Sequence, residues 1–211
     1  MPFRGFPEAA FTFYEGLEAD NSKTYWQDHK ATYDEAVKAP MEALLEELGP
    51  EFGEGKLFRP YRDIRFSADK TPYKTHQGAF IGTDVGAGGY YVEVSAGGLL
   101  AGGGFHAHSA DQTKRLRAAI YGPAGAEFER IIGSLSEAGH EIRGARVSTT
   151  PRGYAKDHPR LELLRHREFM VLKRFGEPAW VGTRRAGTEV EKLWRQITPL
   201  VDWVGEHVGT D

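Results

Sequence analysis

The sequence predicts an α+β fold, in which an antiparallel sheet is packed mainly on one face by helices within a single domain. Three observations carry this prediction. Apolar residues recur at helical spacing before residue 50 and again after residue 109, short stretches between these regions alternate in polarity, and a glycine-rich turn joins two of those stretches directly. We expect a helical N-terminal part over about 6–49, a sheet over about 56–105 and a mixed helix and strand part over about 109–208.

The N-terminal part reads as a series of helices. A first helical face is formed by Phe6, Ala10, Phe13 and Leu17, with Pro7 suited to the first turn. Asp20 and Asn21 interrupt it. A longer face follows at Trp26, Tyr33, Val37, Met41, Leu44 and Leu48. Pro40 should divide this stretch into two helices, and Gly49-Pro50 should end it.

The sheet begins where the pattern changes to period two. In KLFRPYRDIRF, Phe58, Ile64 and Phe66 share one parity, so residues 57–66 are expected to form a strand, with Pro60 marking an edge or a bulge. The stretches AFIG, YYVEVS and LLAGGGF are further strands, and Ala96-Gly97-Gly98 is a hairpin turn between the last two.

Helical spacing returns after the sheet. Ser109 resembles a helix N-cap, with Gln112 placed to reach back to the Ser109 amide. Further helices are expected over 127–138 and 159–166, a strand at FMVLKRF, and a final amphipathic helix that Pro199 kinks or restarts.

Composition excludes several classes of protein. There is no cysteine, which excludes disulfides, thiolate metal sites and cysteine nucleophiles. No signal-peptide pattern and no apolar run near the roughly 18 residues of a membrane span occurs, so we expect a soluble, cytoplasmic protein. The motifs GxSxG, HExxH and the kinase set are absent. The net charge is −3 and the pI about 6.3, which argues against a general nucleic-acid binder.

Basic charge is concentrated in RDIRFSADKTPYK, residues 62–74. Guanidinium and ammonium groups at this density are typical of phosphate or carboxylate sites. The predicted ligand-binding residues here are Arg62, Arg65, Ser67, Lys70, Tyr73 and Lys74. Asp63 and Asp69 are expected to orient the arginines, since neighbouring positive charge makes Asp63 a weak general base. The alternative is a non-catalytic structural or interaction domain in which these charges form an internal salt-bridge scaffold.

Two other stretches carry candidate residues. PRGYAKDHPR supplies Arg152 and Tyr154 in a basic loop, and Tyr154 is added to the predicted ligand-binding residues. GGGFHAH places His106 and His108 two residues apart, on one face of a strand. No third ligand has a distinctive spacing, and histidines at the surface explain the pattern as well, so no metal site is predicted.

The motifs FRPYRDIRFSADKTPYKTH, NSKTYWQDHKATYDE and TTPRGYAKDHPRLELLRHREF together resemble domain-of-unknown-function family 2461 over nearly the whole chain. The resemblance implies a single domain and no particular reaction. It gives functional weight to the matched positions, which include Phe66, Pro72, Pro151 and Gly153 beside the predicted ligand-binding residues. We therefore expect a protein that binds a small anionic ligand, with phosphorylated metabolites among the candidates. The sequence nominates no catalytic residue, cofactor or oligomeric state.

Overall fold

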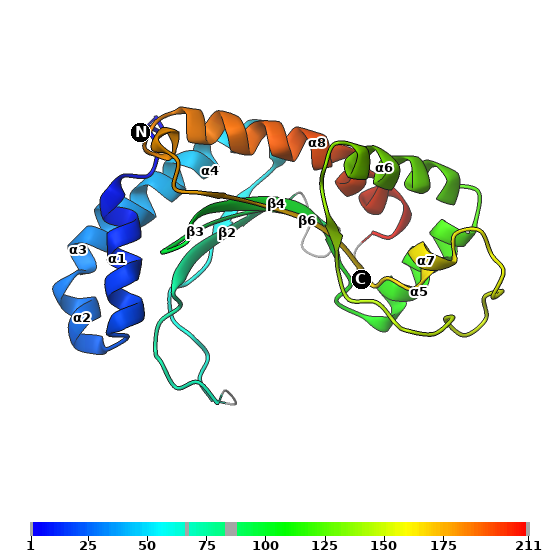
Figure 1. Cartoon of the computed structure of the whole chain (residues 1–211), viewed down its shortest axis with the longest axis horizontal. Coiled ribbons are helices and arrows are strands. Elements are labelled where there is room, and N and C mark those ends of the chain that lie inside the picture. Colours follow the sequence, from blue (N-terminus) through cyan, green and yellow to red (C-terminus); the bar gives the residue numbers. More distant parts are fainter. Residues whose placement is uncertain (1, 66–67, 83–87, 210–211) are drawn as a thin grey trace. The chain divides into compact units, whose positions relative to one another are not determined.

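The computed structural model describes residues 2–65, 68–82 and 88–209, and its strands form one antiparallel sheet (Figure 1). The sheet has the order β1-β2-β3-β4-β6-β5. Its strands are Gly55–Leu57 (β1), His76–Ile81 (β2), Gly89–Ser95 (β3), Gly98–His106 (β4), Ile142–Arg143 (β5) and Glu168–Gly176 (β6). The predicted α+β class with an antiparallel sheet is confirmed.

Helices precede and follow the sheet strands along the chain. The first group comprises Glu8–Ala19 (α1), Lys23–Asp28 (α2), Lys30–Thr32 (α3), a π-helical stretch Tyr33–Lys38 (η1) and Ala39–Phe52 (α4). The second comprises Ala110–Tyr121 (α5), Gly125–Glu137 (α6), Leu161–Leu164 (α7), a 3-10 turn Ala179–Gly182 (η2) and Arg185–His207 (α8). None of the helices in the described ranges combines the length and apolar character that a membrane span needs.

Contacts within the chain group its residues into two compact units, each built from three segments. The first unit contains 1–81, 91–101 and 174–192, and the second contains 82–90, 102–173 and 193–211. In the first unit α4 packs against β1 and β2. Its core includes Phe3 and Leu44, both fully buried, and they approach Gly187 so closely that a side chain there would touch them.

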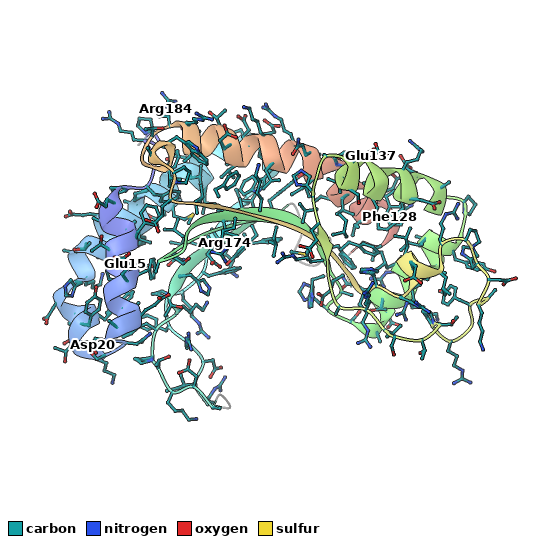
Figure 2. All side chains as sticks on the ribbon, viewed as in Figure 1. Glu15, Asp20, Phe128, Glu137, Arg174 and Arg184 are labelled. Carbon is teal, nitrogen blue, oxygen red and sulfur yellow. The ribbon has the colours of Figure 1, made fainter. Side chains whose placement is uncertain are left out.

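The core of the second unit is centred on Phe128 of α6, which points into its interior (Figure 2). The Phe128 ring meets the ring of Phe169 at 4.8 Å and that of Trp203 at 4.3 Å. The indole N–H of Trp203 donates to the Ala124 carbonyl at 3.3 Å, which satisfies its one polar atom. This packing ties α6 and α8 to β6 within the unit.

The hairpin predicted between β3 and β4 is present. Along β3, Tyr90, Val92 and Val94 are buried and the intervening residues are half-exposed, the alternation of a strand with one covered face. Gly98 follows the turn with φ +87°, and a Cβ there would lie 2.2 Å from the backbone of Gly176. Only glycine fits this position, because it needs both the left-handed conformation and the close approach.

The prediction that residues 57–66 form a strand is wrong, because β1 ends at Leu57. Beyond it the chain still runs beside residues 72–78, with an isolated bridge between Tyr61 and Tyr73 and backbone hydrogen bonds from Phe58 to Gly78 at 3.0 Å and from Arg62 to Pro72 at 2.9 Å. Pro60 has no N–H to donate, so a regular ladder cannot pass through it. The Pro60 carbonyl still accepts from the Lys74 amide at 2.8 Å.

Two predicted helix boundaries also differ. Helix α4 continues through Pro50 to Phe52 rather than ending at Gly49-Pro50, and Gly53 ends it with φ +108°. Of the kink or restart predicted at Pro199, the restart does not occur, because helix α8 is continuous through that residue.

Candidate functional site

Most of the charged side chains of 62–74 have partners within the segment. Arg62 pairs with Asp69, and Arg65 binds Asp63 through two hydrogen bonds of 2.6 and 2.9 Å. Hydrogen bonds from Arg65 lower the pKa of Asp63. The pKa of Asp69 is lowered mainly by hydrogen bonds from the neighbouring Thr71, and Arg62 makes a smaller contribution in the same direction. Lys70 donates from Nζ to the Ile64 carbonyl at 2.9 Å.

Tyr73 and Lys74 face the protein rather than open solvent. The Tyr73 ring is 5% exposed and stacks on Trp26 at 4.3 Å. Lys74 Nζ lies 5.5 Å from the centre of the Phe58 ring, and burial followed by nearby Arg59 lowers the pKa of Lys74. Ser67, the remaining predicted ligand-binding residue of this segment, lies outside the described residues, as does Phe66.

The residue that positions this segment is Asn21, which the sequence reasoning treated only as a helix breaker. Its side-chain amide donates from Nδ2 to the Tyr73 carbonyl at 3.1 Å, and its Oδ1 accepts from the Tyr73 amide at 3.1 Å. One side chain thus satisfies both backbone groups of Tyr73, in the manner of a strand neighbour. An asparagine between two helical patterns gave no signal of this contact.

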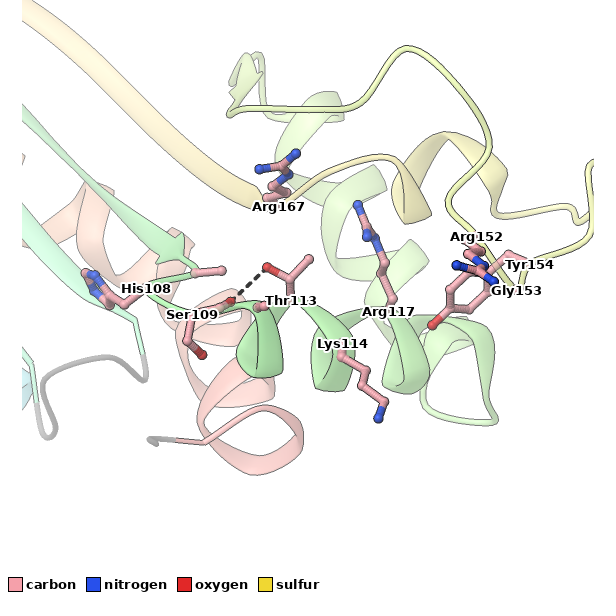
Figure 3. Close-up of a pocket in the computed structure, with 11 residues that line it drawn as sticks. His108, Ser109, Thr113, Lys114, Arg117, Arg152, Gly153, Tyr154 and Arg167 are labelled. Atoms are coloured by element: carbon pink, nitrogen blue, oxygen red, sulfur yellow. Dashed lines mark hydrogen bonds between the residues drawn. The ribbon is translucent and has the colours of Figure 1, made fainter.

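A second group of cations lies around a cavity of about 710 Å³ in the second unit (Figure 3). We call it the basic cavity. The residues that matter for its chemistry are Ser109, Lys114, Arg117, Arg152, Tyr154 and Arg167. Neither Asp nor Glu is among its lining residues. Four full positive charges therefore face a space without a carboxylate on its wall.

Helix α5 supplies one wall of the basic cavity, and its start is well defined. The Ser109 hydroxyl accepts from the Gln112 amide at 3.0 Å, while Gln112 Oε1 accepts from the His108 amide at 2.8 Å. The cap predicted at Ser109 is present, although Gln112 reaches one residue further back than expected. Lys114 and Arg117 follow three residues apart on this helix and both line the cavity, although their side chains extend in different directions (Figure 3).

The other walls come from two backbone segments that are fixed by hydrogen bonds. The Arg167 amide donates to the Ala145 carbonyl at 2.8 Å, and the Arg167 carbonyl accepts from the Ala107 amide at 3.3 Å. The loop bearing Arg152 turns at Gly153, which has φ +92°. These constraints place side chains from distant parts of the sequence around one space.

Arg117 is the most unusual of these cations. Its Nε donates to the carbonyl of buried Leu164 at 2.8 Å, but its Nη2 is buried without a hydrogen-bond partner among the described residues. Figure 3 shows the guanidinium extending from α5 toward Arg167. Burial lowers the pKa of Arg117 most, Tyr154 raises it, and the like charge of Arg167 lowers it again.

Tyr154 is the predicted ligand-binding residue that lines this cavity. Its pKa is raised by burial, an effect that the nearby Arg117 opposes and Tyr121 reinforces. The other predicted residues belong to the first unit. The sequence did not point to three further cations of the cavity. Lys114 and Arg117 lie on a helix whose pattern indicated only an apolar face, and Arg167 lies outside RDIRFSADKTPYK and PRGYAKDHPR, the two stretches that predicted ligand-binding residues.

The two histidines considered as metal ligands lie near the end of β4. His106 Nδ1 is 2.6 Å from Glu168 Oε1, and the rings of His106 and His108 are 5.1 Å apart. In the part of the chain that the structure describes, no three His, Asp or Glu side chains are arranged to hold a metal ion.

Comparison with known proteins gives one match. No curated protein and no solved structure matches the chain. The family model of conserved hypothetical proteins with the domain of unknown function DUF2461 matches residues 9–203, which include all the strands described above and the helices except the first residue of α1 and the end of α8. The chain therefore belongs to the DUF2461 family of conserved hypothetical proteins.

Proposed function

We propose that this protein binds a small phosphorylated ligand in the basic cavity. The observation that carries the proposal is the buried, unpartnered Nη2 of Arg117 beside the like charge of Arg167. A buried donor without a partner costs about 1–3 kcal/mol. A bound anion would supply that partner and neutralise the two guanidinium groups at once.

The number of cations favours a phosphate ester over a monocarboxylate. Lys114, Arg117, Arg152 and Arg167 place four positive charges around the cavity, and none of them forms an ion pair within the described residues. A phosphate monoester carries close to two negative charges at pH 7 and three acceptor oxygens. The first turn of α5, capped by Ser109, adds the partial positive charge of a helix N-terminus.

For residues 62–74 the contacts support the alternative, an internal charge network. Arg62 and Arg65 each form an ion pair with a carboxylate of the same segment, and Lys70 donates a hydrogen bond to a backbone carbonyl. Ligand binding by this segment would require those contacts to be exchanged for new ones. A cytoplasmic location and the lack of general nucleic-acid binding stay predictions from the sequence.

The proposal is tested by calorimetric titration with inorganic phosphate and ribose 5-phosphate at low ionic strength. Arg167→Met should weaken binding by roughly 10- to 150-fold, since a hydrogen bond to a charged group contributes about 1.5–3 kcal/mol. The matched control is Arg143→Met, because Arg143 is exposed, pairs with Glu141 and lies outside the cavity lining. The control should bind as the wild type does.

A third variant separates the two candidate locations. Lys70→Met should leave phosphate binding unchanged if the basic cavity is the site. Loss of binding in Lys70→Met with retention in Arg167→Met would return the site to 62–74. A wild-type protein that binds neither anion would refute the proposal, and equal losses in Arg167→Met and Arg143→Met would show non-specific attraction.

A further inference from the structure

Three aromatic side chains adjoin the basic cavity, namely Tyr121, Tyr154 and His158. We call them the aromatic cluster. Tyr121 ends α5, and its ring stacks on His158 with centroids 4.5 Å apart and planes 27° apart. It also meets Tyr154 at 5.3 Å and a steep angle of 66°. Because Tyr154 lines the cavity, the cluster continues the cavity wall.

Tyr121 is the exposed member of the cluster, whereas Tyr154 and His158 are half-buried. Tyr121 keeps 47% of its surface exposed, although two rings already contact it, and it is one of two large hydrophobic residues that are exposed in the described chain. A large exposed aromatic beside a polar cavity offers apolar area and a π-face to a ligand.

Two hydrogen bonds constrain the loop that carries Tyr154 and His158. The Tyr154 amide donates to the Pro151 carbonyl at 3.2 Å. The Arg160 amide donates to His158 Nδ1 at 3.1 Å, so Nδ1 is an acceptor and a neutral His158 ring carries its proton on Nε2. That arrangement leaves Nε2 as a hydrogen-bond donor at the edge of the cluster.

We infer that the ligand is a phosphomonoester whose other end is a planar aromatic ring, the chemistry of a nucleoside 5′-monophosphate. This inference rests on the proposed function, with the phosphate at Arg117 and Arg167 and the ring on the aromatic cluster. Every nucleobase has a π-face for stacking and acceptor atoms for a donor such as His158 Nε2. A cavity of about 710 Å³ lies within the size range of small-ligand sites.

The test compares adenosine 5′-monophosphate with ribose 5-phosphate, which has the same phosphate and sugar but no base. Stacking of a base on an aromatic side chain increases affinity by roughly 5- to 150-fold, so the nucleotide should bind about fivefold or more tightly than ribose 5-phosphate. Tyr121→Leu should reduce that ratio to about threefold or less while the affinity for ribose 5-phosphate stays unchanged. Tyr121→Phe keeps the ring and should keep the ratio.

The chain offers a matched control in Tyr61, which is 51% exposed but belongs to the first unit. Tyr61→Leu should leave the ratio as in the wild type. If Tyr121→Leu loses ribose 5-phosphate binding through misfolding, His158→Gln gives a second measure, since it removes the ring stacked on Tyr121 and should lower the ratio.

The outcomes separate this inference from the proposed function. Equal binding of nucleotide and ribose 5-phosphate by the wild type overturns the inference and leaves phosphate binding intact. A high ratio that neither Tyr121→Leu nor His158→Gln lowers overturns it as well, because the base then binds elsewhere. Failure of phosphate, ribose 5-phosphate and the nucleotide to bind overturns both.

Discussion

Replacing Asn21 by alanine should cost the protein much of its stability, although Asn21 lies outside both candidate sites. Its side chain makes two hydrogen bonds of 3.1 Å to the backbone of Tyr73, which is 52 residues away in the sequence. These bonds join the turn between α1 and α2 to the 62–74 segment, next to the stacked rings of Trp26 and Tyr73. Alanine removes both bonds.

The size of the effect follows from those two bonds. Each hydrogen bond contributes about 0.5–1.5 kcal/mol net, and a part-buried backbone group that loses its partner adds to the loss. Asn21→Ala should therefore reduce the free energy of unfolding by about 2–3 kcal/mol. For a chain of this size that corresponds to a fall of about 4–12 °C in melting temperature.

Thermal and urea unfolding followed by circular dichroism measure this change. The control is Asp20→Ala, since Asp20 is the exposed neighbour at the end of α1 (Figure 2) and should change stability by less than about 0.5 kcal/mol. If Asn21→Ala lowers the free energy of unfolding by less than about 0.5 kcal/mol, the reasoning is refuted, because water then replaces both hydrogen bonds without cost.

Three further predictions concern single positions. Gly16→Ala should lower the melting temperature, because the added Cβ would lie 2.2 Å from the Tyr25 hydroxyl oxygen. Gly133→Ala is the matched control: its Cβ would meet no atom within 4 Å, so it should raise the free energy of unfolding by about 0.5–1 kcal/mol. Burial lowers the pKa of His166, so the unfolded chain takes up a proton at a higher pH than the folded protein does. The free energy of unfolding of the wild type should therefore fall as the pH is lowered from about 7 to 5. His166→Asn should show a smaller fall when urea unfolding is measured at both pH values. Burial also lowers the pKa of Lys74, so the folded protein bears the cost of its charge at pH 7, and Lys74→Met should melt at or above the wild-type temperature.

Each of these has a contrary outcome. A more stable Gly16→Ala would mean that the Tyr25 ring moves aside freely. An unchanged pH slope in His166→Asn would show that another group titrates. A Lys74→Met variant that melts well below the wild type in plain buffer would show that the ammonium has a stabilising partner.

Much of the fold could be predicted because its signals are local. The α1 face, the Ser109 cap, the turn after β3 and the amphipathic α8 all follow from residues within a few positions of one another. Hydrophobic period and capping chemistry act over that range. The same patterns failed at 57–66, where polarity alternates as in a strand but Pro60 interrupts the ladder.

The sequence by itself determined the α+β class, the family and the presence of excess basic charge in 62–74 and in the loop PRGYAKDHPR. Only the tertiary structure decided which basic side chains of the chain have partners. Arg62 and Arg65 form ion pairs with carboxylates a few residues away in the sequence. Arg117 and Arg167 are fifty residues apart in the sequence, yet they lie near one another on the wall of a cavity. Composition counts charges, but the energy of a charge depends on its distance to the next one and on its burial, and both are set by the fold.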